Sequence, residues 1–273
     1  MQAPRSYLFV PGDRPERFAK ALASGADAVV LDLEDAVLPA AKLAARAAVA
    51  TLLASSQELQ RVVVRINAEG SPWFEEDCAL LARHPGAALM LPKAERVQTL
   101  ANLQARCPGT PLLALVESAV GVLAAVALAA APGVQRLVFG TLDYALDMAL
   151  EGVEATAVGL DFAASQLALA SRAAGLASPV AGVTPAIDDE ALLRAEFARA
   201  RAHGFGAKLC IHPKQVAVVH AALAPSSEEL AWALRVLQAA AGDSGAVQLD
   251  GRMVDRPVIE RARRIQARSG LQT

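Results

Sequence analysis

Cysteine, aromatic residues and long apolar runs are all scarce in this chain of 273 residues. Its three cysteines lie far apart and form neither a CxxC pair nor an even disulfide set, so we expect a reducing, cytoplasmic setting. The longest apolar stretch, Ala119 to Ala131, falls short of the roughly 20 residues that a membrane span needs. The stretch up to Phe18 has no long apolar segment of the kind that defines a signal peptide. We therefore expect no membrane segment and no secretory leader.

A strong excess of positive or negative charge is also lacking, since 26 basic and 28 acidic residues leave a net charge of −2. This balance argues against a general electrostatic role in binding nucleic acid. The GxGxxG, Walker A, GxSxG and HExxH patterns are absent. Hydrophobic residues nevertheless make up 54% of the chain and aromatic residues only 4%, which predicts a large aliphatic core with Ala-rich helices packed close to a sheet.

Short apolar runs alternate with helical segments along most of the chain. Because strands separated by helices pair in parallel, this alternation predicts a (β/α)₈ TIM barrel, an α/β fold, over residues 1–224. The expected strands are Ser6–Val10, Asp27–Leu33, Arg61–Ile66, Ala87–Leu91, Leu112–Val116, Leu137–Phe139, a weak Ser178–Val183, and Ala207–Ile211. Between the sixth and seventh strands we expect helix and loop up to residue 159, then a helix over 160–174.

Residues 225–273 exceed what the barrel needs and predict a C-terminal helical and hairpin extension. Ser226 to Glu229 resembles a capping box, and Asp250-Gly251 suits the turn of a short hairpin. A basic helix is expected from Pro257 to Arg268. We expect this extension to contact a neighbouring subunit and to cover the site.

The stretch from Leu112 to Asp147 organises the expected site. Two neighbouring strands end there, one just before Glu117 and the other shortly before Asp143. Parallel strands place their carboxyl ends at one edge, so the two carboxylates are expected to lie together. Two hard oxygen ligands without His or Cys favour Mg²⁺ over Zn²⁺. The alternative is that both residues serve only to cap the helices that follow.

Other polar residues also follow strands and are expected at the same rim. Arg65 has the geometry to grip a carboxylate in two places. The acidic residues of the LDLED segment are expected either to orient Arg65 or the waters of a metal, or only to form a salt-bridge network. Lys93 is expected to be a positively charged rim residue rather than a Schiff-base nucleophile, and His212 either caps a strand end or touches ligand. The acidic residues concerned are Asp32, Glu34 and Asp35.

Seven segments, taken in order, resemble the citrate lyase β-subunit-like (CitE-like) branch of the HpcH/HpaI aldolase family. They are RSYLFVPGDRPERFAKALASGADAVVLDLEDAV, VVRINAEG, LMLPKAE, LALVESAVGV, FGTLDYALD, KLCIHPKQV and GRMVDRPVIERA. The resemblance covers nearly the whole chain. It implies a (β/α)₈ barrel that assembles as trimers or hexamers. It also implies Mg²⁺-dependent cleavage or formation of C–C bonds in 3-hydroxyacyl thioesters.

The resemblance also assigns roles to individual residues. It places the metal ligands at Glu117 and Asp143 and the substrate-binding arginine at Arg65, and it matches the acidic segment. The segments around Arg14, Arg17 and His212 match regions close to the thioester carrier. In related malyl-CoA and citramalyl-CoA lyases a C-terminal Asp of a neighbouring subunit acts as the base, and Asp255 matches it.

The sequence departs from the family pattern at two positions. Leu142 stands where the family often has Glu, and Val120 stands where it often has Arg or another polar residue. We expect the first change to remove one carboxylate near the metal and the second to alter what the pocket accepts.

Together these features predict a Mg²⁺-dependent lyase that cleaves citramalyl-, malyl- or citryl-CoA to acetyl-CoA and a 2-oxo acid. One alternative is the β-subunit of a citrate lyase complex that acts on a carrier-bound citryl thioester. A non-catalytic CoA-thioester-binding subunit, a metal-free aldolase using Lys93, and hydrolysis or condensation at the same site also stay open.

Overall fold

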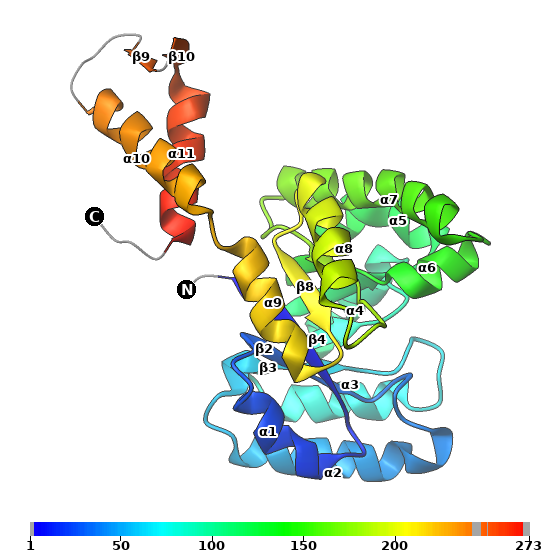
Figure 1. Ribbon diagram of the computed structural model, residues 1–273. Coiled ribbons are helices and arrows are strands. Elements are labelled where there is room, and N and C mark those ends of the chain that lie inside the picture. The colour runs from blue at the N-terminus through cyan, green and yellow to red at the C-terminus, as the bar shows by residue number, and fades with distance from the viewer. Residues whose placement is uncertain (1–2, 242–246, 250, 270–273) are drawn as a thin grey trace. The chain divides into compact units, whose positions relative to one another are not determined.

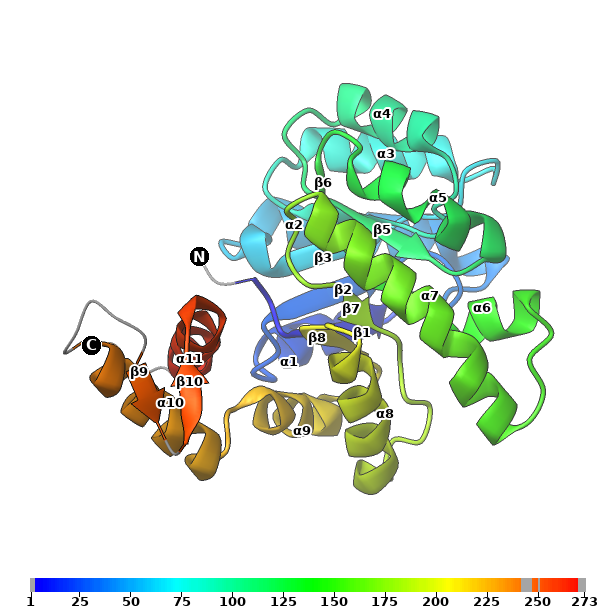
Figure 2. The same cartoon turned by 90° about the horizontal axis from the view of Figure 1, so that it is seen from above.

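Eight parallel strands close into a barrel in chain order, which confirms the predicted (β/α)₈ fold (Figures 1 and 2). The computed structural model describes residues 3–241, 247–249 and 251–269. Strand β8 closes the barrel by pairing with β1, with Ser6 opposite Lys208. The strands are β1 Ser6–Pro11, β2 Ala28–Asp32, β3 Val62–Arg65, β4 Ala88–Leu91, β5 Leu112–Val116, β6 Val134–Phe139, β7 Val180–Ala181 and β8 Ala207–Cys210.

Helices surround the strands on all sides of the barrel (Figure 2). Three single-turn helices, Pro15–Arg17, Pro39–Ala41 and Leu59–Arg61, lie in the connections. The longer ones are α1 Phe18–Leu22, α2 Lys42–Ser55, α3 Phe74–Arg83, α4 Val97–Arg106, α5 Ala119–Ala129, α6 Thr141–Asp147, α7 Val153–Ala173, α8 Glu190–Ala202 and α9 Pro213–Leu223.

The barrel interior is filled by side chains and forms a core instead of a pore. Alternate residues of each strand point inward, so one half of each apolar run packs at the centre and the other half packs beneath the helices. The strands are buried on both faces, which explains why they read as continuous apolar runs in the sequence. The interior cluster consists of Tyr7, Ala28, Val30, Val63, Met90, Leu113, Leu115, Val138, Val180, Ala207 and Leu209. The barrel axis is therefore filled, and the mouth is where the strand ends can form a site.

Helix α7 begins earlier than the sequence predicted. The expected helix and loop before residue 159 are present as the end of α6 and residues 148–152, but the next helix begins at Val153 instead of Leu160, so its predicted start was wrong. Gly159 lies inside α7, and a side chain built on it would approach Leu150 Cδ1 to 2.6 Å. Leu150 thus packs closely against the helix at this glycine, and the helix forms despite the low helix propensity of glycine.

The chain forms two compact units, residues 1–219 and 220–273, whereas the sequence suggested a division at 224/225. The second unit contains α10 Ser227–Ala240, β9 Val247–Leu249, β10 Arg252–Val254 and α11 Arg256–Arg268. Ser226 and Glu229 form the predicted capping box at the start of α10. Strands β9 and β10 pair antiparallel as expected, although Asp250 of the predicted turn lies outside the described residues.

A small apolar core joins α10, β10 and α11 within this second unit. It contains Ala233, Val236, Val254, Ala262 and Ile265. Within the part of the chain that the structure describes, no helix is long and apolar enough to cross a membrane.

Candidate active site at the barrel mouth

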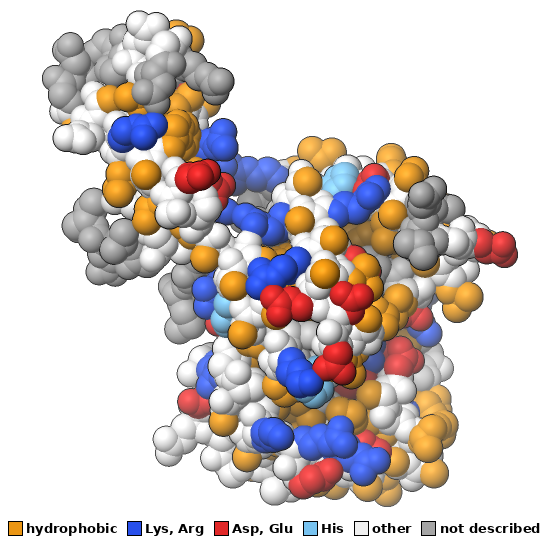
Figure 3. Space-filling view, viewed as in Figure 1, with side chains coloured by type: hydrophobic (Ala, Val, Ile, Leu, Met, Phe, Trp, Pro, Cys, Tyr) orange, Lys and Arg blue, Asp and Glu red, His pale blue; other side chains and the backbone are white. Residues whose placement is uncertain are grey.

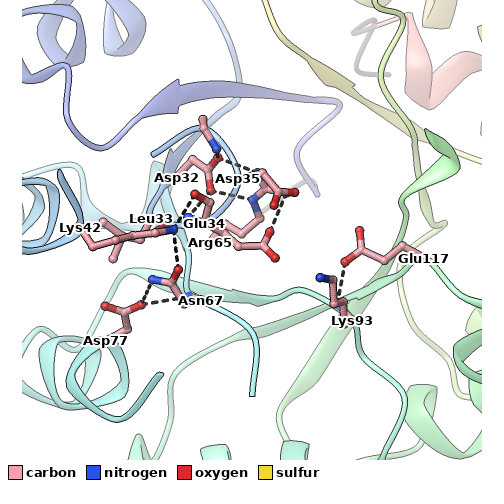
Figure 4. A network of polar contacts seen from close by, with 11 residues as sticks. Asp32, Leu33, Glu34, Asp35, Lys42, Arg65, Asn67, Asp77, Lys93 and Glu117 are labelled. Atoms are coloured by element: carbon pink, nitrogen blue, oxygen red, sulfur yellow. Dashed lines mark hydrogen bonds and ion pairs between the residues drawn. The ribbon is translucent and has the colours of Figure 1, made fainter. Parts of the chain in front are cut away.

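Arg65 lies at the carboxyl end of β3 and is gripped by acidic residues of the neighbouring strand end (Figure 4). Its Nε donates to Asp32 Oδ1 at 2.7 Å and its Nη2 donates to Asp32 Oδ2 at 2.6 Å. Glu34 Oε2 lies 3.1 Å from Nη1, an ion pair that is not aligned as a hydrogen bond. The guanidinium also stacks on Phe9, 4.9 Å from the ring centre. These contacts fix the arginine in one orientation.

Asp32 has no spare acceptor position for a metal-bound water. Besides Arg65, its Oδ1 accepts the backbone N–H of Glu34 at 2.9 Å and its Oδ2 accepts that of Ala36 at 3.0 Å. The carboxylate is also fully buried. The geometry of Asp32 therefore argues against a role in orienting the waters of a metal, and it fits both orienting Arg65 and forming a salt-bridge network with it.

Glu34 and Asp35 have different surroundings. The Glu34 side chain is buried, and burial raises its pKa to about 7 against the lowering effect of Arg65. Asp35 is 61% exposed at its side chain, lies 3.6 Å from Arg65 and lines the cavity at the mouth. Asp35 is thus better placed than Asp32 to meet a ligand or its waters.

The sequence did not predict a buried lysine that supports the acidic segment in contact with Arg65. Lys42 Nζ donates at 2.7 Å each to the backbone oxygens of Leu33 and Glu34 and to Asn67 Oδ1. Asn67 is held in turn by Asp77 (Figure 4). The Lys42 amine therefore holds the backbone of the LDLED segment, which carries the acidic residues, in place. One signal was present in the sequence: a lysine in the first turn of a helix opposes the helix dipole, so it needs another reason to be there.

Glu117 follows β5 and points into the same mouth. Its Oε1 accepts the backbone N–H of Lys93 at 2.8 Å. Lys93 has a φ of 50°, a left-handed conformation that is unusual for a residue with a side chain and that aims its N–H at Glu117. Gly140 leaves space at the other oxygen, because a Cβ there would lie 2.6 Å from Glu117 Oε2. The Lys93 side chain itself is exposed.

A cavity of about 350 Å³ brings most of the predicted site residues together. Glu117 is buried, and Asp143 lies in the first turn of α6 without capping it, since the cap residue is Gly140. Burial raises the pKa of Glu117 to about 8, and the negative charges of Glu34 and Asp143 add to this effect. The charged residues that line the cavity are Asp32, Asp35, Arg65, Glu117 and Asp143.

This surplus of acidic groups suits a cation. Among the described residues, no cluster of three or more His, Cys, Asp or Glu side chains is arranged to enclose a metal. A cation held by Glu117 and Asp143 would therefore need further oxygen ligands from water or substrate, the arrangement that Mg²⁺ prefers.

Four predicted site residues do not line this cavity: the buried Glu34, and Arg14, His212 and Asp255. Arg14 is exposed, and its backbone N–H donates to the oxygen of Pro11. His212 is half-buried, and its Nδ1 accepts the backbone N–H of Lys214 at 3.2 Å, which fits the capping role. Asp255 belongs to the second unit, where it caps α11 by accepting the N–H of Val258.

The two departures from the family pattern have different positions. Leu142 is 53% exposed and lines the cavity at the mouth. Val120 is 57% exposed on α5 and does not line the cavity at the mouth, so its effect on what the pocket accepts stays a prediction.

A closed parallel barrel with an arginine and paired carboxylates at its mouth defines an enzyme of the α/β-barrel class that acts on small anionic substrates. Residues 5–213 match the HpcH/HpaI aldolase/citrate lyase family, and residues 164–271 match the C–C bond lyases of the TIM-barrel fold. The chain belongs to the HpcH/HpaI aldolase/citrate lyase family, as its sequence predicted.

Individual relatives agree with this assignment. A citrate lyase subunit beta-like protein of Mycobacterium tuberculosis (strain ATCC 25618 / H37Rv) is 40% identical over 97% of this chain and 95% of its own. A (3S)-malyl-CoA thioesterase of Cereibacter sphaeroides is 34% identical over 97% of this chain and 94% of its own. The crystal structure of protein CitE from M. tuberculosis in complex with magnesium, acetoacetate and coenzyme A is similar at a TM-score of 0.86 and 38% identity, covering 98% of this chain and 99% of that one.

Proposed function

We propose that the chain is a Mg²⁺-dependent lyase that cleaves a 3-hydroxyacyl-CoA to acetyl-CoA and a 2-oxo acid. The observation that carries the proposal is the cavity at the barrel mouth where Arg65, Glu117 and Asp143 meet. The related CitE complex holds a metal, a small oxo acid and coenzyme A, which are the three components such a reaction requires.

Glu117 and Asp143 are the residues that would hold the metal. The space beside Glu117 Oε2 and the excess of acidic groups fit a divalent cation. When bound there, Mg²⁺ supplies a Lewis acid that polarises the oxygens of the 2-oxo acid half. Lys93 contributes through its backbone, which orients the Glu117 carboxylate.

Arg65 carries the fixed positive charge at the mouth. Asp32 engages its Nε and one Nη2 hydrogen, so other guanidinium hydrogens remain to meet a substrate oxygen. A donor held in place before the reaction stabilises charge that develops on that oxygen in the transition state. We assign Arg65 this role and the binding of the substrate carboxylate.

Asp255, supplied by a neighbouring subunit, is proposed as the general base. It takes the proton of the substrate hydroxyl, and the resulting alkoxide forms the C=O bond of the 2-oxo acid as the C–C bond breaks. The electron pair passes to the thioester enolate, which takes up a proton and leaves as acetyl-CoA. Arg14 and His212 are proposed to contact the CoA portion.

The test uses the full chain with citramalyl-CoA, malyl-CoA and citryl-CoA in turn, first with Mg²⁺ and then with EDTA. We expect Mg²⁺-dependent release of acetyl-CoA from at least one of them. Asp143→Asn should abolish this turnover, whereas Asp147→Asn on the same helix should retain it, because Asp147 caps α5 outside the cavity. Turnover that is insensitive to EDTA and to Asp143→Asn would remove the proposed metal site.

Hydrolysis of the thioester is a second candidate, favoured by the relative named as a (3S)-malyl-CoA thioesterase. Product analysis separates the two reactions. Cleavage of malyl-CoA yields acetyl-CoA and glyoxylate, whereas hydrolysis yields malate and free CoA. Binding of all three thioesters without either set of products would instead favour a carrier-complex or binding subunit.

We also propose that the chain assembles as a homo-oligomer, a trimer or hexamer. Helices α5, α6 and α7 adjoin one another and expose many large apolar side chains. Contiguous apolar surface of this kind marks sites of protein association. The exposed residues are Val120, Leu123, Val126, Leu142, Leu146, Met148, Val158, Phe162 and Leu169.

A further inference from the structure

A second and larger cavity, of about 670 Å³, lies between the barrel wall and helices α7 and α8. Its floor is formed by outward-facing residues of β6, β7 and β8, including Phe139, Ala181 and Lys208. Figure 2 shows α7 and α8 outside the barrel, on the side of β7 and β8. Packed layers normally leave few voids larger than a water molecule, whereas this volume lies within the range of ligand pockets.

The cavity exists because small residues stand where larger aliphatic side chains would fill the layer. Both helices and the strand β7 contribute them. They are Ala145, Gly152, Ala157, Ala164, Ala181, Gly182, Ala195 and Ala200.

The charged residues around the cavity already have partners. Arg199 donates to both carboxylate oxygens of Asp161, and His203 Nε2 lies 3.0 Å from Asp161. Lys208 Nζ donates to the backbone oxygen of Gly182 at 2.7 Å, and Glu196 accepts from Thr184. The surface that is left is therefore mainly aliphatic, and Figure 3 shows hydrophobic side chains at the surface among the charged ones near α8. An uncharged alkyl chain suits such a lining better than an ion.

A thin wall separates this cavity from the barrel mouth. Thr141, Leu142 and Val183 line both cavities. Thr141 packs directly over Gly182, since a Cβ on that glycine would lie 2.2 Å from Thr141 Oγ1. These three side chains therefore separate the two cavities, and Leu142, which is 53% exposed, is one of them.

We infer that the cavity between α7 and α8 receives an alkyl substituent on the hydroxyl-bearing carbon of the thioester substrate, and that Leu142 helps to select it. The inference rests on the proposed lyase function. It extends the substrate class from citramalyl-CoA, with one methyl group, to homologues with unbranched chains of several carbons. After cleavage, the same chain is the tail of the 2-oxo acid product.

Product binding tests this inference without requiring turnover. Calorimetric titration of the full chain with Mg²⁺ present would compare pyruvate with 2-oxoheptanoate, which has a longer tail on the same head group. We expect 2-oxoheptanoate to bind about tenfold more tightly or better, since each methylene buried in an apolar pocket adds affinity.

Two obstructing variants and one control locate the tail. Ala195→Leu on α8 and Ala157→Leu on α7 introduce bulk from opposite walls, and each should abolish the preference for 2-oxoheptanoate over pyruvate. Ala198→Leu is the matched control, because Ala198 is also exposed on α8 but does not line the cavity. The control should keep the preference. Circular dichroism and thermal unfolding would show that the variants fold.

The outcomes distinguish the two proposals. Equal binding of both acids to the wild type, or a preference that survives both obstructions, would overturn the inference while cleavage of citramalyl-CoA still supported the lyase. Absence of cleavage of any thioester would overturn the proposed function. A tail preference that is lost in both obstructed variants would still identify the cavity as an alkyl site.

Discussion

Arg65 is held in its working orientation by the protein before any substrate binds. Asp32 accepts hydrogen bonds from two of the guanidinium nitrogens, and the guanidinium plane stacks on Phe9. An ammonium group cannot reproduce this planar, two-pronged contact, so Arg65→Lys should lower kcat of C–C bond cleavage by about 10²- to 10³-fold, the effect typical of losing one fixed donor. Steady-state kinetics would measure the change.

Arg5 supplies a matched control for this substitution. Its guanidinium makes a similar fork with Asp27, but the residue precedes β1, at the opposite end of that strand from the mouth. Arg5→Lys should leave kcat near that of the wild type. A value of kcat for Arg65→Lys within about threefold of wild type would contradict the role of a fixed charge.

Lys42 acts on the site through the backbone of its neighbours. Lys42→Met would leave three oxygen acceptors, those of Leu33, Glu34 and Asn67, without their donor. Buried acceptors without partners are costly, so we expect a loss on the order of 3 kcal/mol in the free energy of unfolding, measured with urea. We also expect kcat to fall while Mg²⁺ affinity is retained, because the metal ligands lie on other strands.

The exposed Lys20 provides the control for the Lys42 experiment, and Lys20→Met should change neither quantity. If Lys42→Met lost stability but kept full kcat, the lysine would be structural without positioning the acidic segment.

Single residues show what the sequence could and could not predict about the site. Glu117 and Asp143 were predicted to meet because strand ends of a parallel barrel converge, and both line the mouth. The saturation of Asp32 and the part played by Lys42 could not be predicted, since they depend on backbone groups whose directions appear only in three dimensions. The left-handed backbone of Lys93 and the space at Gly140 could not be predicted for the same reason.

At the scale of elements, most strands were predictable because each is an apolar run bounded by turn residues. The start of α7 was not, because Gly159 has a low helix propensity and sequence spacing does not reveal its close packing with Leu150. Strand β7 contains only Val180 and Ala181, so its sequence signal was correspondingly weak.

The layer between β8 and the helices contains a buried lysine with a pH-dependent effect on stability. Burial lowers the pKa of Lys208 from 10.5 to about 8, with Glu196 opposing the shift. Between these two values the unfolded chain binds more protons than the folded protein, so the folded state gains stability as pH rises. Below pH 8 both states are protonated, and the folded state carries the cost of a buried charge.

Lys208→Met isolates this effect between pH 7 and pH 10, because burial holds the pKa of its neighbour Cys210 at about 12, above that range. Between pH 7 and pH 10 the stability of the wild type should rise by roughly 2 to 3 kcal/mol relative to the variant. Urea unfolding at both pH values would measure the difference. A difference that does not change with pH would show that Lys208 keeps an ordinary pKa in the folded protein.

At the scale of the whole molecule, the exposed apolar side chains of α5, α6 and α7 underlie the proposal that the chain assembles as an oligomer. Leu123 is 75% exposed and Phe162 65% exposed, and both belong to this set. Covering such side chains in an interface gains free energy in proportion to the apolar area removed from water. We therefore expect sedimentation velocity at micromolar concentration to find the wild type as a trimer or hexamer.

The double variant Leu123→Glu and Phe162→Glu should sediment as a smaller species, because assembly would bury two charges without partners. Leu43→Glu is the control, since Leu43 is 74% exposed but lies on α2. The cleavage activity of the dissociated variant then tests which subunit supplies the general base. If a neighbouring subunit supplies Asp255, the dissociated variant should lose cleavage although Arg65, Glu117 and Asp143 are intact within each chain. A dissociated variant that keeps full activity would show that the base comes from the same chain, and an undissociated one would place the interface on another face.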